Sequence, residues 1–536
     1  MTPLAGVAAS LEVGLPEPVE ALAGRDWDAI VVGGGHNGLV AAAYLARAGR
    51  SVLVCERRER LGGACTLEQP FGDGWEISPC AYVVGLLDPL VIDELGLRRR
   101  GVEIRVGDPE LYIPFEDGTA FAQFIDERRT EAALREASFA DSEIRALGAF
   151  NERFDRIRRL LRRGPRDTWV GDAPSRAEVE ELLGGERELI DVVFDASIAE
   201  ILDEHFSDER MKRALYPQGL IAAWGGPRTP GTAAIHLMHH MGELEGHPGS
   251  WGYVTGGMGA ISLAIADAAR EAGAVLACGL PVGAIVPGEG VELEDGTRLR
   301  AATVLCNADP KVALRLLDGR DVPAEYRERL EAWSVRCPAL KLNARVGELP
   351  RLPAANGEPW PWLGTVDCTE PLELAEEAFA ACERGDVRIA YAELYSQTAA
   401  DPTPAPGGGH LISAFCQYGP FEPAAGSWDS PLDGNGRTVR EDAARQVIEL
   451  IERFAPGFEA SLADYELIAP PDIEERIGLT GGQIFQGECF PDQMWDRRLS
   501  VRTPVDGLYL CGAATHPGGS VIGLNGRNAA MAALAD

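Results

Sequence analysis

The sequence predicts an α/β protein whose first domain is built on a parallel sheet, and three observations support this prediction. An apolar strand, a glycine-rich turn and an alanine-rich helix follow one another from Asp28 onward. A second apolar strand, 51–56, then ends on an acidic residue. Near the end of the chain, residues 507–530 repeat the order strand, glycine-rich loop, helix. Such alternation is typical of a doubly wound sheet with helices on its faces.

The first glycine-rich turn has the residues that a dinucleotide needs. Gly33 allows a tight turn, Gly35 lets the backbone approach a pyrophosphate, and Gly38 lets the helix pack closely on the strand. The pyrophosphate would lie at the helix N-terminus, and we count Asn37, in the same turn, among the binding residues. Glu56 ends the second strand, where a carboxylate suits two ribose hydroxyls and would repel a 2′-phosphate. The unit therefore predicts a Rossmann-type dinucleotide-binding domain.

A second glycine pair, Gly62 and Gly63, follows the acidic strand in Arg57-Arg-Glu-Arg-Leu-Gly-Gly-Ala. Taken alone, the pair is a turn between a strand and a loop, but it also offers further backbone contacts to a longer dinucleotide. It resembles the Arg-x-Gly-Gly extension of FAD enzymes in the amine oxidase and phytoene desaturase superfamily. The resemblance adds Gly62, Gly63 and Arg57 to the predicted cofactor-binding residues.

The C-terminal segment is similar to the second flavin motif of that superfamily. By this resemblance its closing helix directs its N-terminus at the isoalloxazine, where it would stabilise the negative charge of a reduced flavin. The cofactor-binding residues that it implies are Gly512, Val521, Ile522 and Gly523. His516 lies in the loop that should pass the flavin ring, which makes it the candidate catalytic residue. Its alternative role is to order the Pro-Gly-Gly turn that follows it.

The resemblance to phytoene-desaturase-like flavoproteins extends from about Asp28 to Ala533. Five further segments contribute to it, namely 251–260, 307–310, 341–343, 417–421 and 479–488. It implies a non-covalent FAD, a two-domain fold and redox chemistry at carbon. It also implies that Val282, the first valine of an expected strand, meets the adenine through its backbone. No second dinucleotide motif ends on an acid, so we predict no bound NAD(P).

At 536 residues the chain is too long for a single core, and two domains are expected. The strands expected at 273–286 and 291–300 return to the FAD-binding domain by the same resemblance. The predicted domains are a discontinuous FAD-binding domain of 26–115, 251–330 and 466–536, and an inserted α+β substrate domain of 116–250 and 331–465. Residues 1–25 are rich in Ala, Pro, Gly and Glu and are expected to form a loosely held extension.

Composition excludes several classes of protein. The formal charge of −33 disfavours nucleic acid as a partner. No apolar run approaches the length of about 18 residues that spans a bilayer. The first 25 residues resemble neither a secretory signal nor an Arg-rich transit peptide, so a cytoplasmic location is expected. The eleven cysteines are dispersed, which fits a reducing compartment and offers no redox pair beside the flavin motif.

Residues 141–166 predict an amphipathic helix whose polar side is rich in arginine. Its apolar residues recur at spacings of three and four, at Ile144, Leu147, Phe150, Phe154, Ile157 and Leu161. Such a helix can lie on an anionic membrane surface, which would bring the protein to a lipid-dissolved substrate. The alternative is a solvated helix of the substrate domain.

A histidine cluster raises the question of a metal. His236, His239 and His240 have spacings that place imidazoles on one helical face, as zinc sites require, and His247 is nearby. The segment lacks the glutamate of an H-E-x-x-H motif, and the matching part of the resembling flavoproteins carries no metal. We therefore predict no metal site.

These observations predict an FAD-dependent oxidoreductase, a dehydrogenase or desaturase. A hydrophobic substrate, polyene or carotenoid-like, would give hydride to the flavin, and oxygen or a quinone would accept the electrons. Such chemistry depends mainly on placing a C–H bond beside the flavin. A carotene ketolase-like or amine oxidase-like enzyme remains an alternative. So does a non-catalytic lipid-binding or chaperone protein on the same fold.

Overall fold

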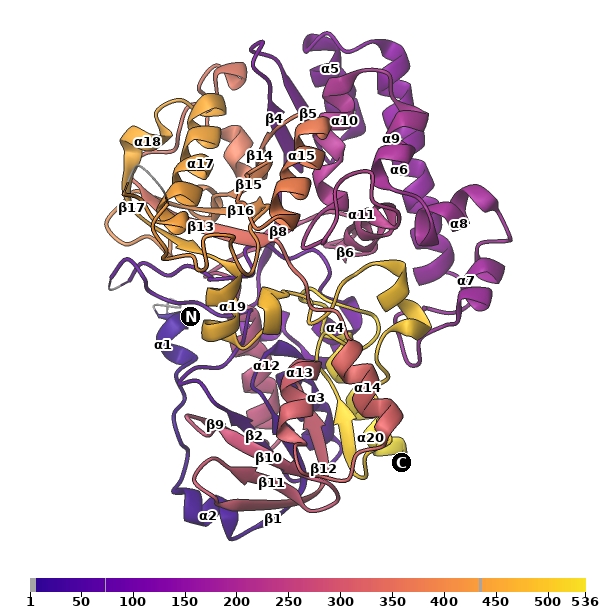
Figure 1. The fold of residues 1–536 in the computed structure, drawn as a ribbon, viewed down its shortest axis with the longest axis vertical. Coiled ribbons are helices and arrows are strands. Elements are labelled where there is room, and N and C mark those ends of the chain that lie inside the picture. The colour runs from indigo at the N-terminus through magenta and orange to yellow at the C-terminus, as the bar shows by residue number, and fades with distance from the viewer. Residues whose placement is uncertain (1–5, 73, 433–435) are drawn as a thin grey trace.

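The computed structural model describes residues 6–72, 74–432 and 436–536 and shows two α/β domains stacked along the long axis of the molecule (Figure 1). The lower domain in that view contains the sheet to which the N-terminal motif belongs. A second sheet and a group of helices form the upper domain. The predicted class, a Rossmann-type domain with an inserted α+β domain, is confirmed.

The lower sheet has a parallel centre. Its parallel strands run in the order β9 (Val275–Cys278), β2 (Val52–Glu56), β1 (Asp26–Val32), β12 (Arg298–Cys306) and β18 (Leu508–Leu510). The hairpin β10 (Val282–Val286) and β11 (Gly290–Leu293) extends it antiparallel from β12. Helices cover both faces, which explains why β1 and β2 are nearly continuous apolar runs.

The helices of the lower domain come from both ends of the chain. On one face α3 (His36–Arg47) packs between α12 (Gly259–Glu271) and α20 (Leu524–Ala535). On the other face α13 (Pro310–Leu316) and α14 (Ala324–Ala332) pack on the apolar residues of β1 and β12. The first and last predicted motifs thus lie side by side.

The upper sheet is mixed and has seven strands. Their order is β17 (Leu462–Ile468), β13 (Ala339–Val346), β16 (His410–Gln417), β15 (Tyr391–Tyr395), β14 (Thr365–Thr369), β4 (Leu111–Pro114) and β5 (Ala120–Gln123). Only β14 and β4 pair in parallel. One face packs its apolar side chains on α17 (Val439–Phe454), and the other faces the lower domain. Strand β4 lies within 26–115, and the end of β17 lies within 466–536. The upper sheet therefore includes residues that the sequence analysis assigned to the FAD-binding domain.

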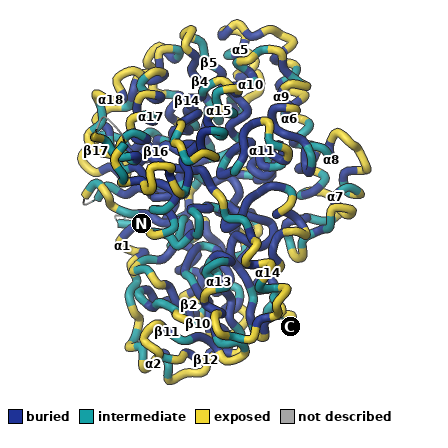
Figure 2. Tube along the Cα trace, viewed as in Figure 1, coloured by how far each residue is buried: buried dark blue, intermediate teal, exposed yellow. Residues whose placement is uncertain are grey.

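Most of the remaining helices form one group beside the upper sheet, at the upper right of Figure 1. They are α5 (Glu127–Glu136), α6 (Asp141–Arg162), α7 (Arg176–Leu182), α8 (Arg187–Phe194), α9 (Ile198–His205), α10 (Glu209–Leu215) and α11 (Thr232–His240). Two short helices lie between the domains, α4 (Pro89–Leu95) and α19 (Pro470–Ile477). The central strands of the upper sheet and α11 are largely buried, whereas α7, α8 and part of β17 carry exposed residues (Figure 2).

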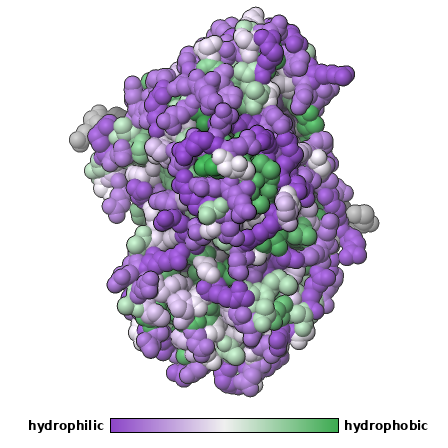
Figure 3. All heavy atoms as spheres, turned by 90° about the vertical axis from the view of Figure 1, so that its right-hand side faces the viewer, coloured by the Kyte–Doolittle hydropathy of each residue, from purple (hydrophilic) through white to green (hydrophobic). Residues whose placement is uncertain are grey.

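Helix α6 is the amphipathic segment expected at 141–166. Its six apolar residues are all buried in the protein. Its polar side is neutralised by ion pairs, because Arg153, Arg156, Arg158, Arg159 and Arg162, with Arg163 and Arg166 beyond its end, each pair with a carboxylate. The face of the molecule in Figure 3 is mostly hydrophilic, with apolar atoms in small patches. These contacts favour a helix of the substrate domain over a membrane-binding helix.

The N-terminal segment is not a loose extension where the structure describes it, from residue 6 onward. Val7, Leu11 and Leu22 are fully buried, and α1 (Val7–Ser10) packs on α12. The Leu61 amide donates to the Leu11 carbonyl oxygen at 3.0 Å. In the sequence these apolar residues show no long helical pattern, so the docking of this segment was not predicted.

Within the described residues, no helix combines the length and the apolarity needed to cross a bilayer.

Candidate functional site

A cavity of about 1150 Å³ lies between the two domains and is lined by residues of both. It brings together predicted cofactor-binding residues that are far apart in the sequence. Those in its wall are Gly33, Gly35, Asn37, Glu56, Arg57, Gly63, Val282 and Val521. They come from the carboxyl ends of β1 and β2, from β10 and from the loop before α20, as expected for a ligand at the end of a parallel sheet.

The other predicted glycines lie behind this wall and shape it. A methyl group on Gly38 would be 2.2 Å from the Gly33 carbonyl oxygen, so only glycine lets α3 approach β1. The Gly62 amide donates to the Gly34 carbonyl oxygen at 2.8 Å and holds the second glycine loop against the first. The group behind the wall also includes Gly512, which follows β18, and Ile522 and Gly523, which precede α20.

The turn between β1 and α3 has the geometry expected for a dinucleotide. Gly33 has φ +99°, a conformation that favours glycine. A Cβ on Gly35 would lie 2.8 Å from Nδ2 of Asn307, so only glycine lets that side chain lie against the turn. The carboxylate of Glu56 accepts hydrogen bonds from the amides of Gly34 at 2.7 Å and Arg58 at 2.8 Å. Burial raises the pKa of Glu56, and the two amides oppose that rise.

Asn307 was not among the predicted site residues. It follows β12, and its Nδ2 donates to the Gly33 carbonyl oxygen at 3.3 Å while its side chain lines the cavity. Its position directly after a strand of the parallel sheet is the signal that could have identified it.

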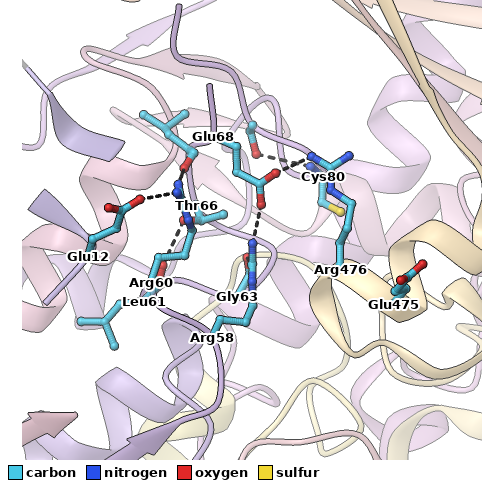
Figure 4. A network of polar contacts seen from close by, with 12 residues as sticks. Glu12, Arg58, Arg60, Leu61, Gly63, Thr66, Glu68, Cys80, Glu475 and Arg476 are labelled. Carbon is cyan, nitrogen blue, oxygen red and sulfur yellow. Dashed lines mark hydrogen bonds and ion pairs between the residues drawn. The ribbon is translucent and has the colours of Figure 1, made fainter. Parts of the chain in front are cut away.

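An ion-pair network anchors the loop that carries Gly62 and Gly63 (Figure 4). Glu68 accepts hydrogen bonds from Arg58, in that loop, and from Arg476, on α19. Although burial opposes it, the two guanidinium groups hold the pKa of Glu68 below its usual range. Arg476 also pairs with Glu466 of the upper sheet at 3.0 Å. The network therefore ties the cofactor loop to the second domain.

The C-terminal motif is held by one buried arginine. Arg498 is 2% exposed, and its guanidinium donates to the Met494 sulfur at 3.8 Å and to five carbonyl oxygens. These belong to Phe485, Glu488, Gln493, Ala513 and Thr515. Beyond this anchor, Ser520 and Val521 line the cavity just before α20 begins. The N-terminus of α20 is thus directed at the cavity, beside that of α3.

His516 lies outside the set of described residues that line the cavity. Its Nε2–H donates to the Thr168 carbonyl oxygen at 2.5 Å, and the side chain is 5% exposed. Burial lowers its pKa to about 4, so the imidazole is neutral at physiological pH. The structure therefore does not bring the candidate catalytic residue to the cavity, and the contact with Thr168 supports the alternative role of ordering its loop.

Part of the cavity wall away from the glycine turns is apolar and aromatic, and the same wall also carries the polar residues Glu131, Asn151 and Asp155. The apolar and aromatic residues include Tyr82, Trp251, Tyr395, Phe415 and Phe485, and then Leu134, Ile144, Leu147 and Phe150 between α5 and α6. The part of the cavity between α5 and α6 forms an arm. Gly148, on the exposed side of α6, lines this arm, which opens to solvent there.

The clustered histidines lie in this wall without forming a metal site. His236 packs between Phe150 and Phe154, with ring centroids 5.4 and 4.6 Å away. The Nδ1 of His239 lies 2.9 Å from the Ile235 carbonyl oxygen. Within the described part of the chain, no three His, Cys, Asp or Glu side chains are placed to hold a metal.

All eleven cysteines are buried free thiols. Burial raises the pKa of Cys65, in the loop beside the glycine pair, to about 12. A thiol held in that state is a poor nucleophile.

Buried ionisable groups cross the inner face of the upper sheet in one row. Asp367, Glu393 and Lys341 lie on β14, β15 and β13, and their neighbours along each strand point to the opposite, apolar face. Glu393 and Lys341 line the cavity. None of the three was predicted as a site residue.

Comparison with known proteins agrees with this geometry. The sequence matches the family of flavin-containing amine oxidoreductases over residues 38–337. The chain belongs to this family. It is a flavin-containing oxidoreductase, and the recognition of the superfamily is confirmed.

The relatives of this flavin-containing oxidoreductase match nearly its whole length. It is 34% identical to the mouse pyridine nucleotide-disulfide oxidoreductase domain-containing protein 2, covering 95% of this chain and 94% of that protein. It is 24% identical to phytoene desaturase (lycopene-forming) of Pantoea ananas, over 94% and 98%. The fold is similar to that of cyclohexylamine oxidase from Brevibacterium oxydans, with a TM-score of 0.57 and 19% identity over 95% and 98%.

The residues at the lower end of the cavity fit the FAD that this family implies. The backbone at Gly33 and Gly35, with the N-terminus of α3, would hold the pyrophosphate. Glu56 has lone pairs left for ribose hydroxyls, and Val282 lines the wall beside it. When bound there, FAD would supply a hydride acceptor.

Proposed function

We propose that this protein is an FAD-dependent dehydrogenase or desaturase that takes hydride from an elongated hydrophobic substrate, such as a polyene, and holds FAD without a covalent bond. One observation supports this proposal above the others. The cavity that contains the dinucleotide motif also includes an arm lined by apolar residues of α5 and α6. A substrate in that arm would lie next to a flavin held by the two glycine motifs.

The residues of this chain would contribute binding, orientation and exclusion of water. The aromatic residues Tyr82, Trp251 and Phe485 would hold an apolar chain in place, and Leu147 and Phe150 would exclude water around it. Holding a C–H bond in this way accounts for much of the rate enhancement in such a reaction.

An amine oxidase-like activity is the main rival. The fold is shared with cyclohexylamine oxidase, but that likeness does not extend to a substrate. The apolar arm favours a hydrocarbon, as does the similarity along the whole chain to a phytoene desaturase. We propose oxygen or a quinone as the electron acceptor.

The test begins with the visible spectrum of the purified protein and continues with anaerobic mixing with phytoene or cyclohexylamine. We expect flavin bands that phytoene bleaches and cyclohexylamine does not. Bleaching by the amine alone would replace the proposal with an amine oxidase. A protein that stays colourless after incubation with FAD would favour the lipid-binding alternative.

Gly148→Trp tests the route of entry. Space is open around this residue for a side chain, which would narrow the opening of the arm without touching the dinucleotide turns. We expect slower flavin reduction by phytoene and an unchanged flavin spectrum. Gly347→Trp is the matched control, because Gly347 is also unobstructed and lies away from the cavity.

A further inference from the structure

Two buried carboxyl groups lie next to each other at the substrate end of the cavity. Asp367 and Glu393 are directly paired across the antiparallel strands β14 and β15. They are 0% and 1% exposed. Side chains paired in this way have Cβ atoms about 5 Å apart, so two negative charges there would repel strongly.

The two carboxyls have different surroundings. Oε1 of Glu393 accepts a hydrogen bond from Gln218 at 2.9 Å, and Oε2 accepts one from the Tyr395 hydroxyl, also at 2.9 Å. Neither oxygen of Asp367 has a hydrogen-bond partner among the described residues. Because donors stabilise a carboxylate, the negative charge of the pair resides on Glu393 and Asp367 keeps its proton.

Lys341 completes the charge balance. It pairs with Phe415 across β13 and β16, and Phe415 pairs with Glu393 across β16 and β15. Lys341 and Glu393 are therefore two strands apart on one face, about 10 Å. The Lys341 ammonium donates to the Cys80 carbonyl oxygen at 2.9 Å and lies 4.6 Å from the Tyr82 ring centroid. Burial lowers the pKa of Lys341, and the nearby Glu393 opposes that shift, so the ammonium and one anion in this row stabilise each other.

We propose that Glu393 is the catalytic base of the substrate chamber and accepts the proton that a dehydrogenated hydrocarbon loses. This inference rests on the proposed function and adds a residue to it. Glu393 suits the role because it lines the cavity, whereas Asp367 lies behind it. The titratable groups near it are Tyr391 and Tyr395 on its own strand, Asp367 on β14, Cys416 on β16 and Lys341 on β13. From outside the sheet, Tyr216 packs on Tyr391 and Tyr82 packs on Tyr395.

The reaction balances with this one base. One C–H bond breaks with its electron pair, which leaves as hydride, for which bound FAD is the acceptor. The C–H bond on the adjacent carbon breaks as an oxygen of Glu393 takes its proton. The electrons of that second bond form the new C=C bond. The substrate loses two hydrogens, and the carboxylate becomes a neutral acid.

A pH titration of the holoenzyme by infrared spectroscopy tests the proposal without turnover. Burial raises the pKa of Glu393 to about 7, opposed by the Tyr395 hydroxyl and by Lys341. We expect the C=O band of a protonated carboxyl to appear as the pH falls through about 7. Glu393→Gln should abolish this titration, and Glu348→Gln, at an exposed carboxylate, should leave it unchanged. An unchanged titration in Glu393→Gln would overturn the proposal.

Flavin reduction by phytoene gives the second readout. The wild-type rate should rise with pH through about 7, because only the carboxylate accepts a proton. Glu393→Gln should be slower by about 10²- to 10⁴-fold, the usual contribution of a general base, and its rate should not depend on pH there. Equal rates in the variant and the wild type would overturn the proposal. If phytoene leaves the wild-type flavin oxidised, the proposed function fails, and the infrared titration still decides whether Glu393 carries the proton.

Discussion

The amide of Gly34 donates a 2.7 Å hydrogen bond to Oε2 of Glu56, so the acid at the end of β2 is fixed against the glycine turn at the end of β1. The second oxygen of Glu56 accepts from the Arg58 amide. A carboxylate has about four acceptor positions, so this arrangement leaves lone pairs directed away from the backbone. The same group thus orders the turn and remains able to bind a ribose.

Glu56→Gln should weaken FAD binding. The amide has only one acceptor oxygen, so it cannot serve both backbone amides and a ribose hydroxyl. Loss of one or more hydrogen bonds to a charged group costs about 1.5–3 kcal/mol, which raises the FAD dissociation constant roughly 10- to 100-fold. Titration of FAD into deflavinated protein measures it. Glu59→Gln, an exposed neighbour, should bind normally, and equal affinity in both variants would refute the role of Glu56.

Gly38→Ala should lower stability and cofactor retention together. The new methyl group would lie 2.2 Å from the Gly33 carbonyl oxygen, far inside contact distance, and would push α3 away from β1. Overpacking of this kind costs about 1–3 kcal/mol. Thermal unfolding with and without added FAD should show a lower Tm and a smaller stabilisation by FAD. Gly347→Ala, where nothing lies within 4 Å, is the control and should behave as the wild type.

Arg498→Lys should destabilise the C-terminal flavin motif. The guanidinium reaches five carbonyl oxygens from two segments, and an ammonium with three donors cannot reach them all. Each unpaired buried carbonyl costs about 1–3 kcal/mol, so we expect the free energy of unfolding to fall by several kcal/mol. Urea denaturation, monitored by flavin absorbance, measures this free energy. Arg497→Lys, at the exposed neighbouring residue, is the matched control. An equal fall in the free energy of unfolding in this variant would contradict the anchoring role of Arg498.

The sequence was sufficient to predict the cofactor-binding end of the cavity, because each motif that forms it is a continuous stretch of the chain. Gly33, Gly35 and Glu56 lie in one strand–turn–helix–strand unit, and the ends of parallel strands meet at one edge of a sheet. The position of Val521 followed from resemblance alone. In the structure both groups line one cavity.

The ionisable residues at the substrate end of the cavity could not be predicted, because their sequence pattern fits two different environments. Lys341 lies between Leu340 and Leu342, and Glu393 lies between Ala392 and Leu394, which is also the pattern of a strand with one face in solvent. Tertiary packing buries that polar face, because Cys80 of the lower domain covers Lys341 and Gln218 of the helix group covers Glu393. His516 illustrates the same limit, because its direction depends on Thr168, which is 348 positions away in the chain.

The buried histidines should make the protein less stable in mild acid. Burial lowers the pKa of His236 to about 3, and the pKa of His36, His239 and His516 to about 4. Unfolded histidine titrates near pH 6.5, so between about pH 6.5 and 4 the unfolded chain binds protons that the folded chain does not. The contribution of these histidines to stability is therefore constant above this window and falls as the pH drops through it.

His236→Phe should flatten that fall. The ring lies among Phe150 and Phe154, which accommodate a phenyl group, and each buried neutral histidine contributes about 1.4 kcal/mol per pH unit inside the window. Urea unfolding at pH 7.5, 6 and 5 should show a smaller loss of stability than in the wild type. His205→Phe, at a less buried histidine, should keep the wild-type slope. A slope unchanged by His236→Phe would mean that this imidazole is protonated in the folded protein, and its position between two phenyl rings would then need a different account.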